Sequence, residues 1–265
     1  MTSGDVREFL VAAGDFLAAD PVAHTLLLTE AAYLDAAAGA ELDDGCAFGW
    51  WVDEAGAVAG AFLRAPRHPP VLTPVPAEAL PSLVGVLGEM DALGVDGRDV
   101  ERVASVWLDR TGVVLVERFR VALCRLVTPQ WGGNESGVEF RRATVDDREL
   151  LVGWFHELMA ANPGDPSDLG YVIDDPLRYG GLTLWEVGGR PVAMCGRSRV
   201  VAGMTRVSAA YAPDGRTDAV FAAACAEASQ VAEHVLVLTT DVAAHRALGF
   251  EVVLDRVTLE PRAVV

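Results

Sequence analysis

Residues 188–259 have the sequence GGRPVAMCGRSRVVAGMTRVSAAYAPDGRTDAVFAAACAEASQVAEHVLVLTTDVAAHRALGFEVVLDRVTL. Several of its segments alternate apolar and polar residues or form short apolar runs, which is typical of β-strands. A long alanine-rich segment among them has helical spacing. The stretch therefore predicts a mixed α/β unit with these elements in order: strands Pro191–Val200 and Met204–Tyr211, helix Asp218–Ala232, strand Val235–Thr240, short helix Val242–Leu248 and strand Val252–Leu259.

The rest of the chain continues this mixed pattern. Helical spacing or strand alternation predicts, in order, helices Val6–Ala19 and Val22–Ala38, a hairpin over Ala47–Leu63, an extended piece at Pro70–Val75, helices Ala77–Leu93 and Asp99–Asp109, strands Val113–Val127 and Val138–Ala143, and a strand at Thr183–Val187. Thr144 and Asp147 have the spacing of a capping box, so a helix is expected from Thr144 to about Met159.

A glycine-rich segment near the middle of the chain, 128–137, predicts a join between two domains. A similar feature lies on each side of it: Trp51 and Trp185 each precede a glycine-containing turn and then a Val-Ala pair at the same spacing. Such repetition favours two domains of one fold. We expect domains at 1–130 and 131–265, joined near Gly132–Gly137, each with a twisted mixed sheet flanked by helices.

Composition excludes several classes of protein. The formal net charge is −17 and every basic residue is an arginine, whereas a nucleic-acid-binding protein needs a basic surface. No apolar run approaches the length of a membrane helix, and the N-terminus lacks the pattern of a signal peptide. The four cysteines form no metal-binding pair, so we expect reduced core thiols and no metal. These features predict a cytoplasmic protein that binds neither nucleic acid nor membrane.

Four short motifs lie in this order in the second half of the chain: Leu184-Trp-Glu-Val-Gly-Gly-Arg-Pro-Val-Ala-Met194, Ala210-Tyr-Ala-Pro213, Leu238-Thr-Thr-Asp241 and His245-Arg-Ala-Leu-Gly-Phe250. Together they resemble the two-domain bacterial N-acetyltransferases of the GNAT superfamily. The resemblance implies tandem GNAT-like domains, a degenerate one at 1–130 and one at 131–265 that carries an acyl-CoA cleft.

The resemblance also implies where acetyl-CoA would bind. The end of the strand at Tyr211 and Ala212 corresponds to the position that meets the pantetheine arm. The phosphate loop and the start of its helix correspond to Arg216, Thr217, Asp218, Ala219, Val220 and Phe221. This loop departs from the family pattern, because Thr217 and Ala219 replace its glycines and Asp218 places a carboxylate at the helix N-terminus. Asp218 is expected to cap the helix and to compete with a pyrophosphate, leaving Arg216 to attract it.

The catalytic segment differs from the family as well. The tyrosine that protonates the departing thiolate is replaced by His245, which is either a general acid or an ordinary helix residue. Asp241 either caps the following helix or orients an amine substrate. On the first helix of the second half, His156 and Glu157 either line an acceptor cleft or lie on the surface. His24, in the first half, is expected on the surface.

Two functions follow from the resemblance. The first is an acyl-CoA-dependent N-acyltransferase that transfers an acetyl group to a small amine, with His245 and Asp241 as catalytic candidates. The alternative is a GNAT-fold binding module that has lost catalysis and no longer uses acetyl-CoA. The altered loop at Arg216–Ala219 is the feature that separates them.

Overall fold

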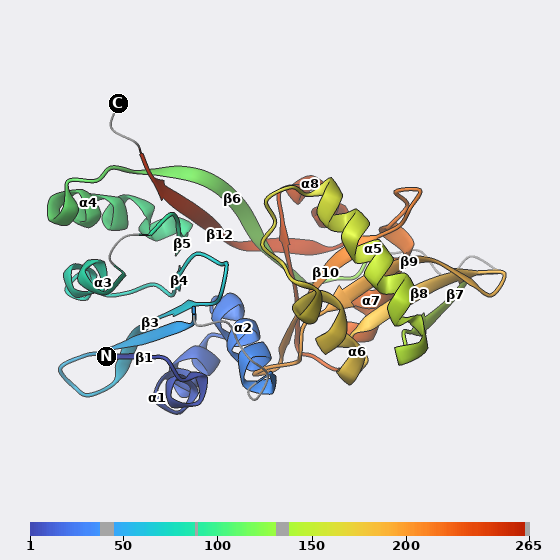
Figure 1. Cartoon of the computed structure of the whole chain (residues 1–265), viewed down its shortest axis with the longest axis horizontal. Helices are drawn as coiled ribbons and strands as arrows, with labels where there is room; N and C mark the ends of the chain where they lie inside the picture. Colours follow the sequence, from blue (N-terminus) through green and yellow to red (C-terminus); the bar gives the residue numbers. More distant parts are fainter. Residues whose placement is uncertain (38–44, 88–89, 131–137, 263–265) are drawn as a thin grey trace. The chain divides into compact units, whose positions relative to one another are not determined.

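The computed structural model describes residues 1–37, 45–87, 90–130 and 138–262 (Figure 1). The chain forms two compact units. Unit 1 comprises Met1–Leu123 and Val252–Val265, and unit 2 comprises Cys124–Glu251. The expected join at Gly132–Gly137 lies outside the described residues.

Unit 1 contains a mixed sheet with the strand order β1-β2-β3-β4-β5-β12-β6. Strands β2 and β3 form the predicted antiparallel hairpin, β4 pairs in parallel with β5, and β5 pairs antiparallel with β12. The elements are β1 (Thr2–Ser3), α1 (Val6–Ala19), α2 (Thr25–Ala36), β2 (Ala47–Val52), β3 (Val58–Arg64), β4 (Val71–Leu72), α3 (Leu80–Leu87), β5 (Leu93–Asp96), α4 (Val100–Thr111), β6 (Leu115–Leu126) and β12 (Phe250–Pro261).

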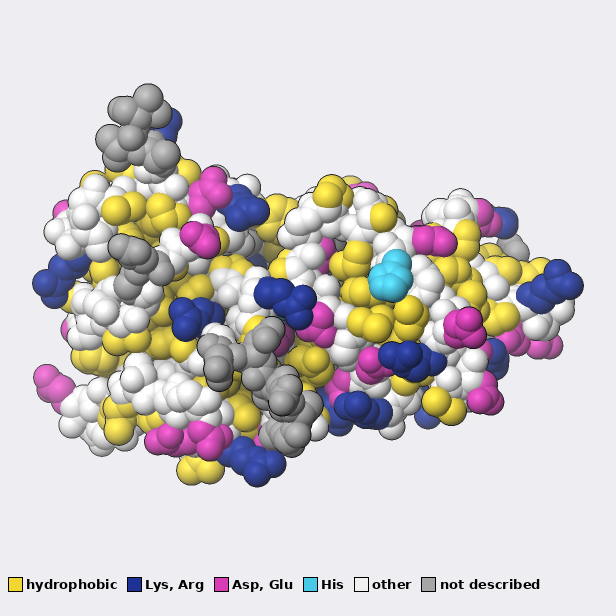
Figure 2. All heavy atoms as spheres, in the orientation of Figure 1, with side chains coloured by type: hydrophobic (Ala, Val, Ile, Leu, Met, Phe, Trp, Pro, Cys, Tyr) yellow, Lys and Arg dark blue, Asp and Glu magenta, His cyan; other side chains and the backbone are white. Residues whose placement is uncertain are grey.

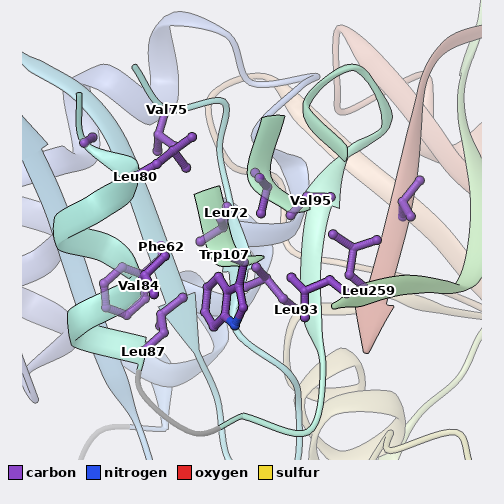
Figure 3. Packing of buried hydrophobic residues seen from close by; sticks show 14 residues of the cluster. Phe62, Leu72, Val75, Leu80, Val84, Leu87, Leu93, Val95, Trp107 and Leu259 are labelled. Carbon is purple, nitrogen blue, oxygen red and sulfur yellow. The ribbon is translucent and has the colours of Figure 1, made fainter. Parts of the chain in front are cut away.

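The core of unit 1 lies between this sheet and helices α3 and α4. In Figure 3, Val84 of α3 lies near Phe62 of β3 and Trp107 of α4 lies beside Leu93 of β5, all within one buried cluster. Helix α1 packs against the hairpin, where the rings of its Phe9 and of Phe48 in β2 stack at 5.3 Å. All these side chains are buried, so apolar burial supplies the stability of the unit.

Two expectations for this unit are wrong. Of the helix expected at Ala77–Leu93, α3 spans only Leu80–Leu87, and Leu93 instead begins strand β5, whose short apolar sequence carries no alternation of its own. His24 was expected on the surface, but only 6% of it is exposed. Its ring lies 4.9 Å from that of Phe16, and its Nδ1 donates to the backbone oxygen of Leu17 at 3.1 Å.

Unit 2 contains a mixed sheet with the strand order β11-β10-β9-β8-β7. Strands β7, β8, β9 and β10 are neighbours in chain order, each antiparallel to the next, whereas β10 and β11 are parallel. The elements are β7 (Val138–Arg142), α5 (Arg148–Ala161), a π-helical turn at Gly170–Asp174, α6 (Asp175–Tyr179), β8 (Leu182–Val187), β9 (Arg190–Arg197), β10 (Met204–Tyr211), α7 (Asp218–Ala228), β11 (His234–Thr239) and α8 (Val242–Ala247).

Helices cover both faces of this sheet, with α5 in front of it and α7 behind it in Figure 1. The alternation of β-strand residues decides which helix each side chain meets. Leu184 and Met194 pack in a cluster with Trp154 of α5. Thr183, adjacent to Leu184 in the strand, points the other way and donates from Oγ1 to Glu227 of α7 at 2.8 Å.

The two halves of the chain share one order of elements: strand, two helical segments, three strands, helix, strand, helix, strand. The capping box predicted at the start of the second half is present, with Thr144 and Asp147 bonded to each other's backbone. The last strand, β12, does not complete unit 2. It pairs with β5 in unit 1, so the compact units are not two consecutive stretches of chain.

Candidate functional site

Strands β10 and β11 part from each other along their length. Their paired residues are Met204 with His234, Thr205 with Val235, and Arg206 with Leu236, which are the first three residues of each strand. Beyond Arg206, β10 continues to Tyr211 and remains paired with β9 on its other side. The edge of β10 that faces β11 therefore has backbone groups that a bound molecule can contact.

A β-bulge lies in the part of β10 that has left β11. The register with β9 shifts between Ser208 and Tyr211, and Ala209 within this shift has a φ of +54°. Alanine rarely adopts a positive φ, because its Cβ approaches the backbone there. A bulge removes backbone groups from the ladder and redirects them, and strained backbone of this kind is concentrated at functional sites.

All the residues predicted for the site lie at one edge of the unit 2 sheet. Tyr211 and Ala212 end β10, the loop at Arg216 and Thr217 leads into α7, and Asp241 and His245 follow β11. Because β10 and β11 are parallel, their carboxyl ends meet at the same edge, which is where α/β proteins bind ligands. Not every one of these side chains can contact a ligand. Ala212, Val220 and Phe221 are buried, so a ligand could reach little more than their backbone atoms or the edge of the Phe221 ring.

The loop before α7 is closed by an ion pair within itself. The carboxylate of Asp214 accepts from the backbone N–H of Arg216 at 3.1 Å and from its Nε and Nη2 at 2.8 and 2.6 Å. These hydrogen bonds with Arg216 hold the pKa of Asp214 below its usual value. The arginine expected to attract a phosphate therefore already has a carboxylate partner two residues away.

The expected helix cap at Asp218 is wrong. Thr217 is the residue at the N-cap of α7, and its side chain makes no capping hydrogen bond. Asp218 is the first residue of the helix and is exposed. Its negative charge would oppose an anion at this helix end, whereas Asp214 is the carboxylate that accepts from Arg216.

His245 has a defined orientation on α8. Its Nδ1 lies 2.9 Å from the backbone oxygen of Asp241, which can only accept, so Nδ1 carries a proton and Nε2 is the nitrogen available for exchange. The ring meets those of Phe221 and Phe250 edge-on, with centroid distances of 5.4 and 5.8 Å. Two buried aromatic rings thus hold the imidazole in place.

Asp241 caps α8. Its Oδ1 accepts from the backbone N–H of Ala244 at 2.9 Å, and its own N–H donates to the hydroxyl of Thr239. Of the two roles considered for Asp241, the capping role is therefore present in the structure. The carboxylate also fixes the first turn that carries His245.

Tyr211 and Glu157 form a contact that the sequence did not reveal. The phenolic hydroxyl of Tyr211 donates to Oε2 of Glu157, and this hydrogen bond raises the pKa of Tyr211. The tyrosine ring also lies 6.2 Å from the ring of Trp154, one turn before Glu157 on α5. His156 and Glu157 are both exposed. Spacing along α5 carries no signal for this pairing, because Tyr211 is distant in sequence.

Residues 1–37, 45–87, 90–130 and 138–262 contain no cluster of His, Cys, Asp and Glu suited to a metal ion. Within the same ranges, no helix is long and apolar enough to cross a membrane. The cysteines Cys124, Cys195 and Cys225 are buried thiols, as expected, and Cys46 is a half-buried thiol. On the face drawn in Figure 2, arginines (dark blue) are scattered among carboxylates (magenta) and form no continuous basic patch.

No protein-family model matches the chain, and no curated protein matches it. Solved structures do. A GCN5-related N-acetyltransferase from Kribbella flavida has a TM-score of 0.53 at 18% identity, over 78% of this chain and 89% of that one. A GNAT-family acetyltransferase from Colwellia psychrerythraea has a TM-score of 0.54 at 14% identity, over 82% and 85%. A Drosophila protein has a TM-score of 0.62 at 13% identity, over 96% and 95%.

Proposed function

We propose that this chain, which has the fold of the GCN5-related N-acetyltransferases, is an acyl-CoA-dependent N-acyltransferase that acetylates a small amine. The observation that carries the proposal is the separation of β10 from β11 beyond Arg206, together with the bulge at Ala209. An opening between two parallel strands exposes backbone groups to an extended arm such as pantetheine. Redirected N–H groups at a bulge supply donors for the oxyanion that forms during acyl transfer.

His245 is the residue we assign to proton transfer. The uncharged amine attacks the thioester carbonyl, a C–N bond forms, the C–S bond breaks, and one proton passes from nitrogen to solvent while another is delivered to sulfur. As an imidazolium, His245 donates that second proton from Nε2, since Nδ1 is held by the backbone oxygen of Asp241. Its contacts with Phe221 and Phe250 keep the ring oriented, which lowers the cost of reaching the reactive geometry.

Glu157 is the residue we assign to the acceptor amine. It meets the end of β10 through Tyr211, and its carboxylate is exposed. A carboxylate at this place attracts an ammonium group and accepts its hydrogen bonds. The negative net charge of the whole chain also attracts a cationic substrate.

One observation favours the alternative function, a binding module without catalysis. The ion pair between Asp214 and Arg216 closes the loop at which a CoA pyrophosphate would be held. The residues present therefore fit the pantetheine end of acetyl-CoA better than its diphosphate end. A chain that had abandoned acetyl-CoA would show the same loop.

A product assay combined with thermal unfolding separates the two functions. The purified chain is incubated with acetyl-CoA and a panel of small primary amines, and acetylated amine is detected by mass spectrometry. We expect acetylation of at least one amine, and a higher melting temperature with acetyl-CoA because ligand binding stabilises the folded state. If no amine is acetylated and the melting temperature does not change, the binding module replaces the enzyme as our interpretation.

A further inference from the structure

We propose that the acyl donor is recognised through its acyl and pantetheine portion alone. Thioesters that lack the nucleotide diphosphate should therefore be used with a kcat/KM similar to that of acetyl-CoA. This inference rests on the proposed function, and it names the donor class of the same site. It follows from a difference between the two ends of that site: the opening between the strands is present, whereas the arginine of the phosphate loop, Arg216, is already paired with Asp214.

The carboxylate of Asp214 occupies the donors of Arg216 that an external anion would use. A phosphate at a loop before a helix is held by backbone N–H groups and by a cation. Here the N–H of Arg216 donates to Oδ1 of Asp214, and both Nε and Nη2 of Arg216 donate to Oδ2. The N–H of Gly215 is also used, since it donates to the backbone oxygen of Ala212 at 2.9 Å.

The charge of the loop opposes a diphosphate as well. From Pro213 to Asp218, the first residue of α7, two carboxylates (Asp214 and Asp218) outnumber the single arginine, Arg216. All three side chains are exposed, so the ion pair itself contributes little to stability. Asp214 nevertheless competes with a dissolved anion for Arg216, because it lies two residues away in the chain and so has a higher effective concentration than a dissolved ligand reaches. A diphosphate would have to displace Asp214 and accept the repulsion of both carboxylates.

The opposite end of the site has no such obstacle. Past Arg206 the facing edge of β10 is unpaired with β11, and the bulge at Ala209 redirects backbone groups there. Neither Asp214 nor Asp218 belongs to this stretch. Binding energy for the donor therefore comes from the arm and the acyl group. The chemical step is unchanged: the C–N bond forms, the C–S bond breaks, and sulfur receives a proton.

The test compares acetyl-CoA with S-acetylpantetheine as donors for the same amine. We expect values of kcat/KM within about tenfold of each other, which is a small difference for donors that differ by an entire nucleotide. Calorimetric titration should likewise give CoA and pantetheine similar Kd values. The double substitution Asp214→Asn with Asp218→Gly should raise kcat/KM for acetyl-CoA at least about tenfold relative to acetylpantetheine, because it frees Arg216 and removes both negative charges.

A control with the same change of net charge is Asp146→Asn with Asp165→Asn, at exposed positions outside the loop. It should leave the donor ratio as in the parent chain. A parent that uses acetyl-CoA more than about a hundredfold better than acetylpantetheine overturns the inference while the proposed function stands. If neither donor acetylates any amine, the proposed function fails, and a CoA that binds far more tightly than pantetheine overturns the inference independently of activity.

Discussion

Asp214 lies in the loop before α7 and Asp218 is the first residue of that helix, but of the two only Asp214 is hydrogen-bonded to Arg216. The sequence draws attention to Asp218, because a carboxylate at a helix start has a known relation to the helix dipole. The conformation of the loop instead turns the carboxylate of Asp214 toward Arg216. At the scale of the residue, local rules thus identify which side chains are charged but not which of them meet.

Substitution of His245 tests its role as the acid. We expect His245→Ala to lower kcat about 10²–10⁴-fold with little change in amine binding, because the thiolate then leaves without a proton donor. His245→Tyr should restore part of the activity, since a phenol can also donate. Steady-state kinetics at saturating donor measure both effects.

The control for His245 is Arg246→Ala, which alters the next, exposed residue of the same short helix. It should keep most of the activity if the loss in His245→Ala reflects chemistry and not damage to α8. Full activity in His245→Ala under conditions where chemistry limits the rate would mean that the imidazole serves only to pack against Phe221 and Phe250.

The burial of His24 predicts how stability depends on pH. Desolvation lowers the pKa of His24, although its hydrogen bond to Leu17 and the nearby Asp20 act in the opposite direction and Arg256 acts with burial. The unfolded state therefore takes up a proton at a higher pH than the folded state. Stability from this group is complete above about pH 6.5 and falls as the pH drops below it toward the folded-state pKa.

Urea unfolding of the parent and of His24→Gln at pH 7.5 and pH 5 measures this effect. The loss of unfolding free energy between the two pH values should be smaller in His24→Gln, because the variant has no ring to protonate. His156→Gln, at an exposed position, serves as the control and should show the loss seen in the parent. Identical pH dependence in all three proteins would contradict the prediction.

At the scale of the element, the turn between α8 and β12 requires glycine. Gly249 has a φ of +93°, and a Cβ built there would lie 1.7 Å from the backbone oxygen of Thr128. Its own carbonyl accepts from the N–H of Val127 at 3.0 Å, so this close approach is part of the hydrogen bonding of the turn. The following residue, Phe250, is one of the rings that hold His245.

Gly249→Ala should destabilise the protein by about 2–5 kcal/mol, from a strained positive φ together with overpacking against backbone. Gly112→Ala is the matched control. Gly112 also has a positive φ, +73°, but a Cβ there meets nothing within 4 Å. That variant should lose only about 1–2 kcal/mol. Chemical unfolding of both variants gives the comparison, and equal losses would show that the contact with Thr128 is relieved without cost.

At the scale of the whole molecule, the end of the chain completes unit 1. Val257 and Leu259 of β12 are buried in the core cluster that includes Leu93 and Trp107, and β12 pairs with β5 along its length from Arg256 to Leu259. Two buried aliphatic side chains contribute roughly 3–6 kcal/mol, a large share of the total stability of a domain. Residues 1–130 are therefore not expected to fold without β12.

A fragment of residues 1–130 should show no cooperative thermal transition by circular dichroism. Addition of a peptide of residues 250–262 should restore one, because the peptide supplies Val257 and Leu259 together with the backbone partners of β5. The same peptide with Val257→Asp and Leu259→Asp should fail to do so. A cooperative transition in the fragment alone, at the temperature of the complete chain, would contradict this account.

Much of the fold could be predicted from the sequence, because the relevant forces act over a few residues. Helix α1 (Val6–Ala19) and strand β10 (Met204–Tyr211) have the predicted bounds, since their apolar spacing and the polar residues that flank them define a face and two ends. The capping box at Thr144 and Asp147 formed for the same reason. The mixed α/β class follows from the order of such elements.

The remainder was decided by contacts between distant parts of the chain. Nothing local in Leu93–Asp96 distinguishes a buried strand from the end of a helix; pairing with β12 makes it a strand. Burial of His24, the contact of Tyr211 with Glu157 and the parting of β10 from β11 likewise depend on which segments the folded chain brings together. The sequence by itself determined the elements and the candidate residues of the site. Only the tertiary structure decided their partners, because hydrophobic pattern specifies a face without specifying what will cover it.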